Sequence, residues 1–222
     1  MIQLSVNTNE ASYSVDVFPP LVELGSWDFK KDCIRDLTLC FDIAMRDIFC
    51  SGEFDKVNKI SFKKFYSGSR ETFELNAGYD TLITKSENFD DIQKAMDRHV
   101  TALDAVLKRV TFSPRFQVAA YQAHANVANG HVKEYLDSMI PSGPTLPGEL
   151  RNKGAVFIFD GPVSNSTLQI VLGESQVVPG GLFCGIQYSF PGSTETYKSL
   201  IKTVVDYSTE QVFPGLGIKM IG

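Results

Sequence analysis

The sequence predicts an α+β protein. In it, two tandem β-α-β-β-β-α halves share one mostly antiparallel curved sheet or partial barrel, with the helices packed outside. Three observations support this prediction: long segments with apolar residues at three- and four-residue steps, shorter segments in which apolar and polar residues alternate, and an order of segments that repeats once. Hydrophobic residues make up 43% of the 222 residues, which is typical of a globular protein.

The first half, residues 13–110, is expected to begin with a strand over residues 13–24. Two prolines at 19 and 20 interrupt this strand, and because proline cannot donate to a ladder, we expect a sheet edge or a bulge there. An amphipathic helix follows and ends near residue 52. Its apolar stripe consists of Phe29, Cys33, Leu37, Phe41, Ala44 and Ile48.

Three strands and a second long helix complete the first half. The strands are expected over residues 56–66, 71–76 and 79–84. Asn88 or Asp90 begins the helix, which cannot continue through Pro114 because proline lacks the backbone N–H that a helix needs.

The second half, residues 115–212, repeats this order. The expected elements are a strand over 115–127, a helix over 131–140, strands over 155–160, 167–172 and 182–190, and a helix from residue 193 to about residue 212. Residues 141–148 contain three prolines and two glycines and are predicted to form an exposed, mobile loop. Residues 155–159 are apolar on both faces, so their strand is expected in the centre of the sheet.

We expect residues 1–222 to form a single compact unit. Each half alone could cover only one face of its own strands, so the two halves are predicted to share a core. The concave sheet face or the seam between the halves is then the natural place for a ligand or a partner.

Composition narrows the class of protein. The net charge is −5, which disfavours binding to a phosphate backbone, so no nucleic-acid partner is expected. No run of 18 apolar residues and no signal peptide are recognisable, so neither a membrane span nor secretion is expected. Cysteines occur at positions 33, 40, 50 and 184 without metal-binding spacing, which indicates reduced thiols in a cytoplasmic protein without a metal or another cofactor.

A short motif suggests a family. The segment Phe18-Pro19-Pro20-Leu21-Val22-Glu23-Leu24 resembles the Pro-Pro-Leu/Ile-Val-Glu opening strand of a sporadically distributed, uncharacterised bacterial family, which has Asn where this chain has Phe18. At the level of fold alone, the duplicated layout is similar to that of haem- and drug-binding proteins of the SOUL and gyrase-inhibitor type.

The candidate binding residues lie on the strand at 115–127. Alternation places Gln122, His124 and Asn126 in a polar row on one face, where they could bind a ligand at the mouth of a cavity, with Tyr121 nearby. The other interpretation is that the strand simply leaves the core there. No nucleophile elbow, phosphate-binding loop or metal-binding helix is present in the sequence, so no catalytic residue is assigned.

Three hypotheses about function remain. The first is a non-enzymatic cytosolic protein that binds a protein partner or self-associates as a homo-oligomer. The second is a binder of a small hydrophobic ligand or haem at the seam between the halves. The third, and least favoured, is an enzyme with a site around His124, because catalytic groups can meet in space from distant parts of a chain.

Overall fold

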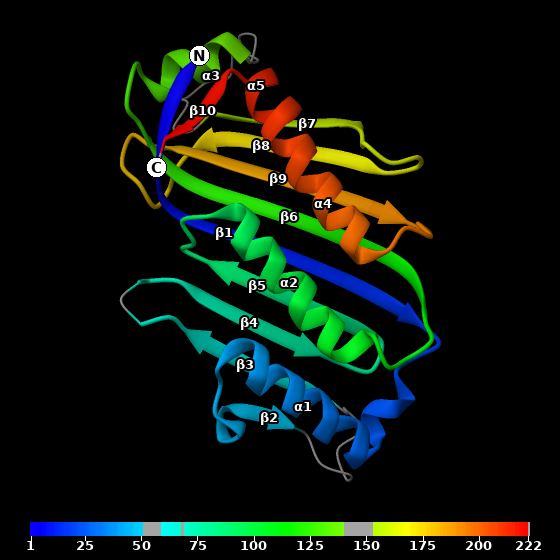
Figure 1. Ribbon diagram of the computed structural model, residues 1–222. Helices are drawn as coiled ribbons and strands as arrows, with labels where there is room; N and C mark the ends of the chain where they lie inside the picture. Colours follow the sequence, from blue (N-terminus) through cyan, green and yellow to red (C-terminus); the bar gives the residue numbers. More distant parts are fainter. Residues whose placement is uncertain (51–58, 68, 140–152, 222) are drawn as a thin grey trace, which may run out of the picture.

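The computed structural model describes residues 1–50, 59–67, 69–139 and 153–221. It is an α+β structure in which, among these residues, ten strands form one open sheet (Figure 1). The strands are β1 (Ile2–Phe18), β2 (Ile48–Cys50), β3 (Ile60–Phe65), β4 (Thr72–Ala77), β5 (Thr81–Glu87), β6 (Ser113–Val127), β7 (Gly154–Asp160), β8 (Thr167–Glu174), β9 (Leu182–Pro191) and β10 (Ile218–Ile221).

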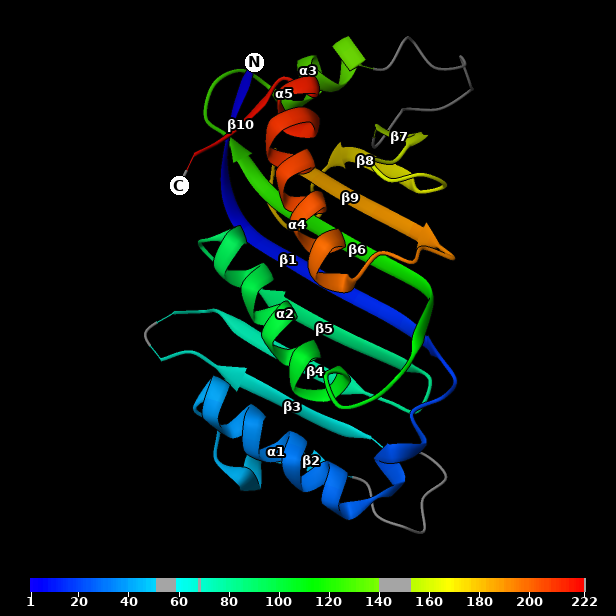
Figure 2. The ribbon, with the colours of Figure 1, turned by 45° about the vertical axis from the view of Figure 1, so that its right-hand side comes forward.

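Three long helices cover one face of this sheet, which we call the helix face (Figures 1 and 2). They are α1 (Trp27–Phe41), α2 (Ile92–Leu107) and α4 (Tyr197–Tyr207). The shorter helices α3 (Val132–Met139) and α5 (Phe213–Gly215) lie near β10. None of the helices in the described residues is both long and apolar enough to cross a bilayer.

The two halves meet where β1 and β6 pair antiparallel, from Leu4 opposite Val127 to Phe18 opposite Ser113. Outward from this seam, the order is β5, β4, β3 and β2 on one side and β9, β8 and β7 on the other. The halves therefore match in the order of their main elements and in strand neighbours, apart from the extra strands β2 and β10. The predicted α+β sheet with helices packed on it is confirmed.

On the opposite face of the sheet, which we call the open face, the side chains change from charged to uncharged at the seam. One row of side chains across the strand register consists of Lys63, Glu74, Lys85, Ser12, Ala120, Gln187, Gln169 and Ile158. In the first half the row is charged, and Lys85 Nζ lies 2.8 Å from a carboxylate oxygen of both Glu10 and Glu87. Charged side chains keep this part of the face in favourable contact with water.

The beginning of β1 differs from the sequence-based expectation. The strand starts at Ile2 rather than near Tyr13, and it carries irregularities in pairing between Val6 and Thr8 and between Asp16 and Val17. The two prolines end it, as the chain passes after Phe18 into a 3₁₀ turn. Polar residues at 7–10 break the alternation on which the expectation relied.

Strand β7 is not in the centre of the sheet, so that expectation was wrong. β7 pairs with β8 and lies at the end of the strand order among the described residues. As a result, Val156 and Ile158 are 59% and 71% exposed on the open face. Apolar residues on both faces indicate a strand that is easily buried, but they do not identify what buries it. The predicted loop at 141–148 lies outside the described residues.

Candidate functional site

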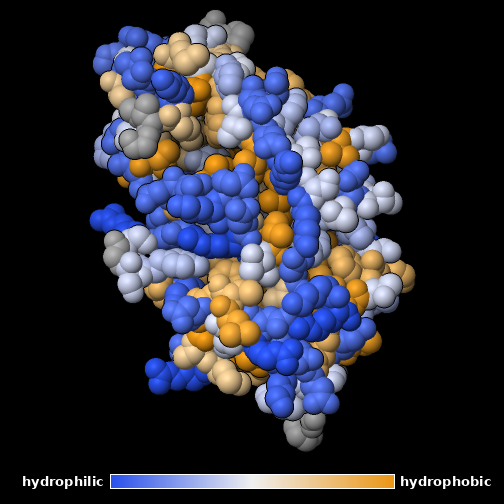
Figure 3. Space-filling model, viewed as in Figure 1, coloured by the Kyte–Doolittle hydropathy of each residue, from blue (hydrophilic) through white to orange (hydrophobic). Residues whose placement is uncertain are grey.

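A hollow of about 900 Å³ opens at the seam between the halves. We call it the seam hollow. Its walls come from β1, the turn before β4, the start of α2, β6, the end of α4 with α5, and β10. Figure 3 shows hydrophobic surface in the gap between the hydrophilic surfaces of α2 and α4.

The hollow exists because β1 lacks a neighbour along part of one edge. On this side, β10 pairs with β1 from Ile2 to Ser5, and β5 pairs with it from Glu10 to Asp16. Between them, over residues 6–9, no described strand pairs with β1 on that side. Residues 5–9 all line the seam hollow.

Asn9 holds one wall of this gap in place. Its side-chain Nδ2 donates to the carbonyl of Phe89 at 2.8 Å, and its Oδ1 accepts from the backbone N–H of Phe89 at 2.9 Å. The backbone N–H of Asn88 also donates to the carbonyl of Asn9 at 2.8 Å. Asn88 has a left-handed φ of 52°, which asparagine tolerates better than most residues. The loop that leads into α2 is thereby fixed against β1.

Three aromatic rings form the apolar wall. Tyr121 of β6 contacts Phe89 and Phe213 edge-on, with ring centroids 6.3 Å and 6.0 Å apart. Burial raises the pKa of the Tyr121 hydroxyl, so it is a neutral phenol at physiological pH. Phe213 follows a π-helical turn, Ser208–Val212, that continues α4. Such turns are rare and are found frequently at functional sites.

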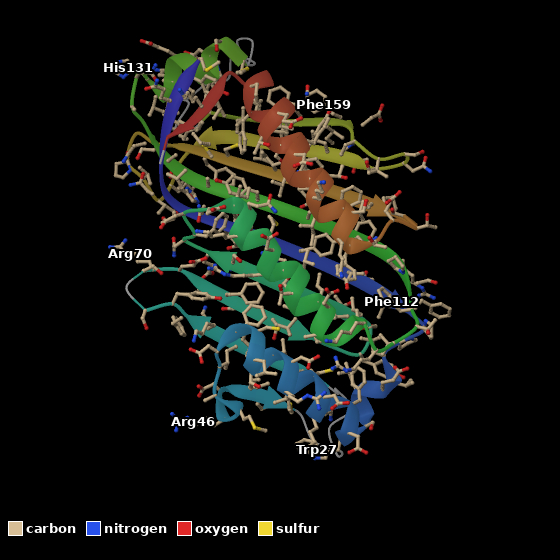
Figure 4. All side chains as sticks on the ribbon, in the orientation of Figure 1. Trp27, Arg46, Arg70, Phe112, His131 and Phe159 are labelled. Carbon is tan, nitrogen blue, oxygen red and sulfur yellow. The ribbon has the colours of Figure 1, made fainter. Side chains whose placement is uncertain are left out.

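The rim of the seam hollow is polar and carries more positive than negative side chains. Arg70 and Lys219 supply cationic groups and Asp90 supplies a carboxylate, whereas the whole chain has a net charge of −5. Figure 4 places Arg70 at the periphery, on the side of the molecule where α2 begins. The rim is therefore locally more basic than the rest of the protein.

The structure keeps Gln122, His124 and Asn126 on one face of the sheet, and it places the ring of Tyr121 at the other face. Tyr121 lines the seam hollow, whereas Gln122, His124 and Asn126 belong to the open face, because successive residues of a strand point to opposite sides. Gln122 lines a second hollow of about 250 Å³ on the open face, to which Tyr121, Gln169 and Gln187 also contribute.

His124 and Asn126 make structural contacts. Ser175 Oγ accepts backbone hydrogen bonds from Val177 at 3.1 Å and Val178 at 2.8 Å, and it lies 2.8 Å from Nδ1 of His124, to which its hydroxyl can donate. The His124 ring packs on Phe183 with centroids 5.0 Å apart. The backbone N–H of Asn126 donates to Asn7 Oδ1 at 3.1 Å. The contacts of Ser175 hold the turn after β8 in place, and the hydrogen bond to Asn7 stabilises β1 where its pairing is irregular.

Two further observations concern metal ligands and buried thiols among the described residues. No group of three or more His, Cys, Asp or Glu side chains within them could hold a metal ion. Burial raises the pKa of Cys33 to about 11 and that of Cys184 to about 12, so neither thiol ionises at neutral pH.

Comparison with known proteins adds no assignment. No protein-family model matches the chain, and a search of curated proteins found no significant similarity. The resemblance to the bacterial Pro-Pro family and the analogy with the SOUL and gyrase-inhibitor fold therefore stay predictions.

Sequence reasoning found Tyr121 but missed its partners. Phe89 lies in the loop before α2 and Phe213 begins the short helix α5, both outside the periodic segments, so no pattern connected them with residue 121. One signal was available. Asn7 and Asn9 interrupt a stretch that otherwise suits a strand, and asparagine is depleted in strands, so they marked a place where β1 deviates from regular pairing.

Proposed function

We propose that this protein is a non-enzymatic binding protein that holds a ligand with an apolar body in the seam hollow. One observation supports this proposal above the others: a hollow of about 900 Å³ with an aromatic wall lies at the meeting of the two halves. This volume is within the range of drug-sized ligand sites, which combine an apolar lining with a few polar groups.

The hydrogen bonds around Asn9 also support a binding role. They hold the wall in position without a ligand, so little conformational entropy is lost when one binds. Residues of both halves contribute to the lining, which agrees with the second of the three hypotheses from the sequence.

A fluorescence titration with the hydrophobic probe 8-anilinonaphthalene-1-sulfonate tests the proposal, together with thermal-shift assays using the same probe and haem. Thr209→Trp places an indole at the mouth of the hollow from an exposed position. We expect saturable binding to the wild type and at least tenfold weaker binding to this variant. Thr194→Trp, an exposed substitution at the other end of α4, should bind the probe as the wild type does. Equal binding by all three proteins would contradict the proposal.

Self-association is the second candidate, and the exposure of Val156 and Ile158 on strand β7 favours it. A free strand edge with apolar side chains is a template for pairing with another chain. Multi-angle light scattering should show a dimer or a larger assembly that Ile158→Lys dissociates. Leu39→Lys, which changes an exposed apolar residue on α1, should leave the assembly intact. A monomeric wild type at all concentrations would eliminate this candidate.

The correspondence of the halves supports an internal structural duplication as part of this proposal. The strand neighbours match from the seam outward, and the hollow lies at their junction. A protein whose two related units meet at one hollow can present both to a single ligand.

A further inference from the structure

We infer that the ligand of the seam hollow is an amphiphile with a hydrocarbon chain and a single anionic head group. The chain lies against the aromatic wall, and the head group, a carboxylate or a phosphate ester, stays at the rim. This inference rests on the proposed binding role and names the class of ligand.

The first argument is the apolar character of the wall. Beside the rings of Phe89, Tyr121 and Phe213, the apolar residues Ile92 and Ile218 also line the hollow. The side-chain amide that holds this wall, that of residue 9, has both its nitrogen and its oxygen engaged with the backbone of Phe89. A ligand body rich in polar atoms would lose hydrogen bonds to water here, whereas a hydrocarbon chain gains free energy by leaving water.

The second argument is a pair of cations that the protein itself does not neutralise. Arg70, which precedes β4, and Lys219 of β10 both line the hollow, and neither side chain makes an ion pair or a hydrogen bond to another described residue. In contrast, Lys63, Lys85 and Arg98 are each paired with a glutamate. The two rim cations are therefore available to a carboxylate or a phosphate, with which they can form charge-assisted hydrogen bonds.

The third argument is the exposure of the charged rim. Arg70, Lys219 and the one carboxylate of the rim, Asp90, are all exposed, and Figure 4 shows Arg70 at the periphery of the molecule. A head group at this place would keep its contact with water and avoid the desolvation penalty of a buried charge. Because cations outnumber the carboxylate, the rim favours an anionic head group over a cationic one, whereas the net charge of −5 disfavours anions over most of the remaining surface.

Isothermal titration calorimetry with compounds that share one hydrocarbon chain tests the inference. Decanoate, decyl phosphate, 1-decanol and decylammonium are each titrated below the concentration at which they form micelles. We expect at least one of the two anions to bind about tenfold more tightly than 1-decanol and decylammonium, and the tighter anion identifies the head group. Thr209→Trp should weaken the binding of this anion about tenfold, because its indole lies at the mouth of the hollow.

A pair of double variants separates the rim cations from net charge. Arg70→Glu/Lys219→Glu should weaken the anion about tenfold or more and leave 1-decanol unaffected. Lys31→Glu/Lys202→Glu changes the net charge equally at exposed positions on α1 and α4 outside the lining, and should bind both compounds as the wild type does.

The outcomes distinguish this inference from the binding role on which it rests. If 1-decanol or decylammonium binds as tightly as the anions, or if the two double variants lose equal affinity for them, the anionic head group is wrong. The binding role still stands in that case if Thr209→Trp weakens 1-decanol. Anions that bind Thr209→Trp as tightly as the wild type would lie outside the hollow, which also overturns the inference. If neither these compounds nor 8-anilinonaphthalene-1-sulfonate binds the wild type, the binding role itself is wrong.

Discussion

Two polar side chains buried under the helices show how single residues shape this core. His99 of α2 lies fully buried with Nδ1 2.6 Å from Thr84 Oγ1 and Nε2 3.2 Å from Ser86 Oγ. Gln117 of β6 accepts from the hydroxyl of Tyr13 at 2.7 Å. A buried polar group without a partner costs about 1–3 kcal/mol, so these hydrogen bonds specify how strand and helix fit together.

The pH dependence of stability should identify His99. Burial, together with the charge of Arg98, lowers the pKa of His99 to about 3, whereas an unfolded histidine titrates near 6.5. Between these values the unfolded chain binds a proton that the folded protein does not, so the free energy of unfolding falls as the pH falls below 6.5. From pH 7 to pH 5 this group should account for a loss of about 2 kcal/mol.

Urea unfolding of His99→Gln at both pH values tests this prediction. The variant should lose about 2 kcal/mol less than the wild type between pH 7 and pH 5, because glutamine does not titrate. His131→Gln, at an exposed position, should retain the wild-type pH dependence. The same pH dependence in wild type and His99→Gln would contradict the assignment.

The pair of Tyr13 and Gln117 leads to a second prediction at this scale. Gln117→Leu removes the acceptor of the buried Tyr13 hydroxyl and the donor to the carbonyl of Glu195. We expect a loss of about 1–3 kcal/mol in the free energy of unfolding, measured by urea denaturation. Gln187→Leu makes the same change on the open face, where the side chain is exposed, and should cost less than about 0.5 kcal/mol. Similar losses in both variants would mean that this hydrogen bond has no special role.

At the scale of elements, one carboxylate links α1 with the end of α2. Asp36 lies 2.5 Å from Lys108 Nζ and also pairs with Arg109. Burial acts against its ionisation, but hydrogen bonds from these two side chains hold the pKa of Asp36 below its ordinary value. The resulting contribution to stability is present at neutral pH and is lost as the pH falls through the lowered pKa.

Asp36→Asn should therefore reduce the free energy of unfolding at pH 7 by about 1–2 kcal/mol, since it leaves Arg109 without its charged partner. The control is Asp32→Asn, one turn earlier on α1, whose pair with Arg35 is solvent-exposed and should contribute less than about 0.5 kcal/mol. Chemical denaturation at pH 7 measures both. Equal losses in the two variants would show that the pairs of Asp36 stabilise the protein no more than an exposed ion pair does.

Periodicity predicted most elements but not their neighbours. Helix α2 and the strands β4, β5, β8 and β9 lie close to their expected positions, because an apolar stripe or an alternation is a property of the local sequence. The position of β7 in the sheet depends on its pairing with other segments and not on its local sequence. Its apolar pattern indicates burial, and only the pairing order reveals that this part of the strand lies at an edge. The aromatic wall of the seam hollow could not be predicted for the same reason, since Phe89 and Phe213 meet Tyr121 only after the sheet has formed.

At the scale of the whole molecule, the longest pairing joins the two halves. β1 and β6 lie beside each other from Leu4 to Phe18, and side chains of both belong to one cluster of buried residues with α2 and α4. Across the same seam, Lys198 of α4 lies 2.8 Å from Asp104 of α2, and Tyr197 donates to the same carboxylate. Each half separately would expose this surface to water.

Fragments 1–112 and 113–222 should consequently not fold alone. Neither should show a cooperative thermal transition by circular dichroism, because each would expose one side of the β1–β6 pairing and the apolar residues beneath it. Mixing the two should restore helical signal and a cooperative transition. A single fragment that unfolds cooperatively as a monomer would show that the halves are independent domains.

Along one side of β1, β10 and β5 leave only the short interval at residues 6–9 without a described strand partner. A chain that approached this interval would meet β10 and β5 before it could form an extended ladder. Growth of a longer ladder along β1 is thus blocked sterically, in contrast to the edge at β7, where nothing among the described strands limits the length of pairing. The flanking strands therefore protect β1 against the runaway stacking to which uncapped edges are prone.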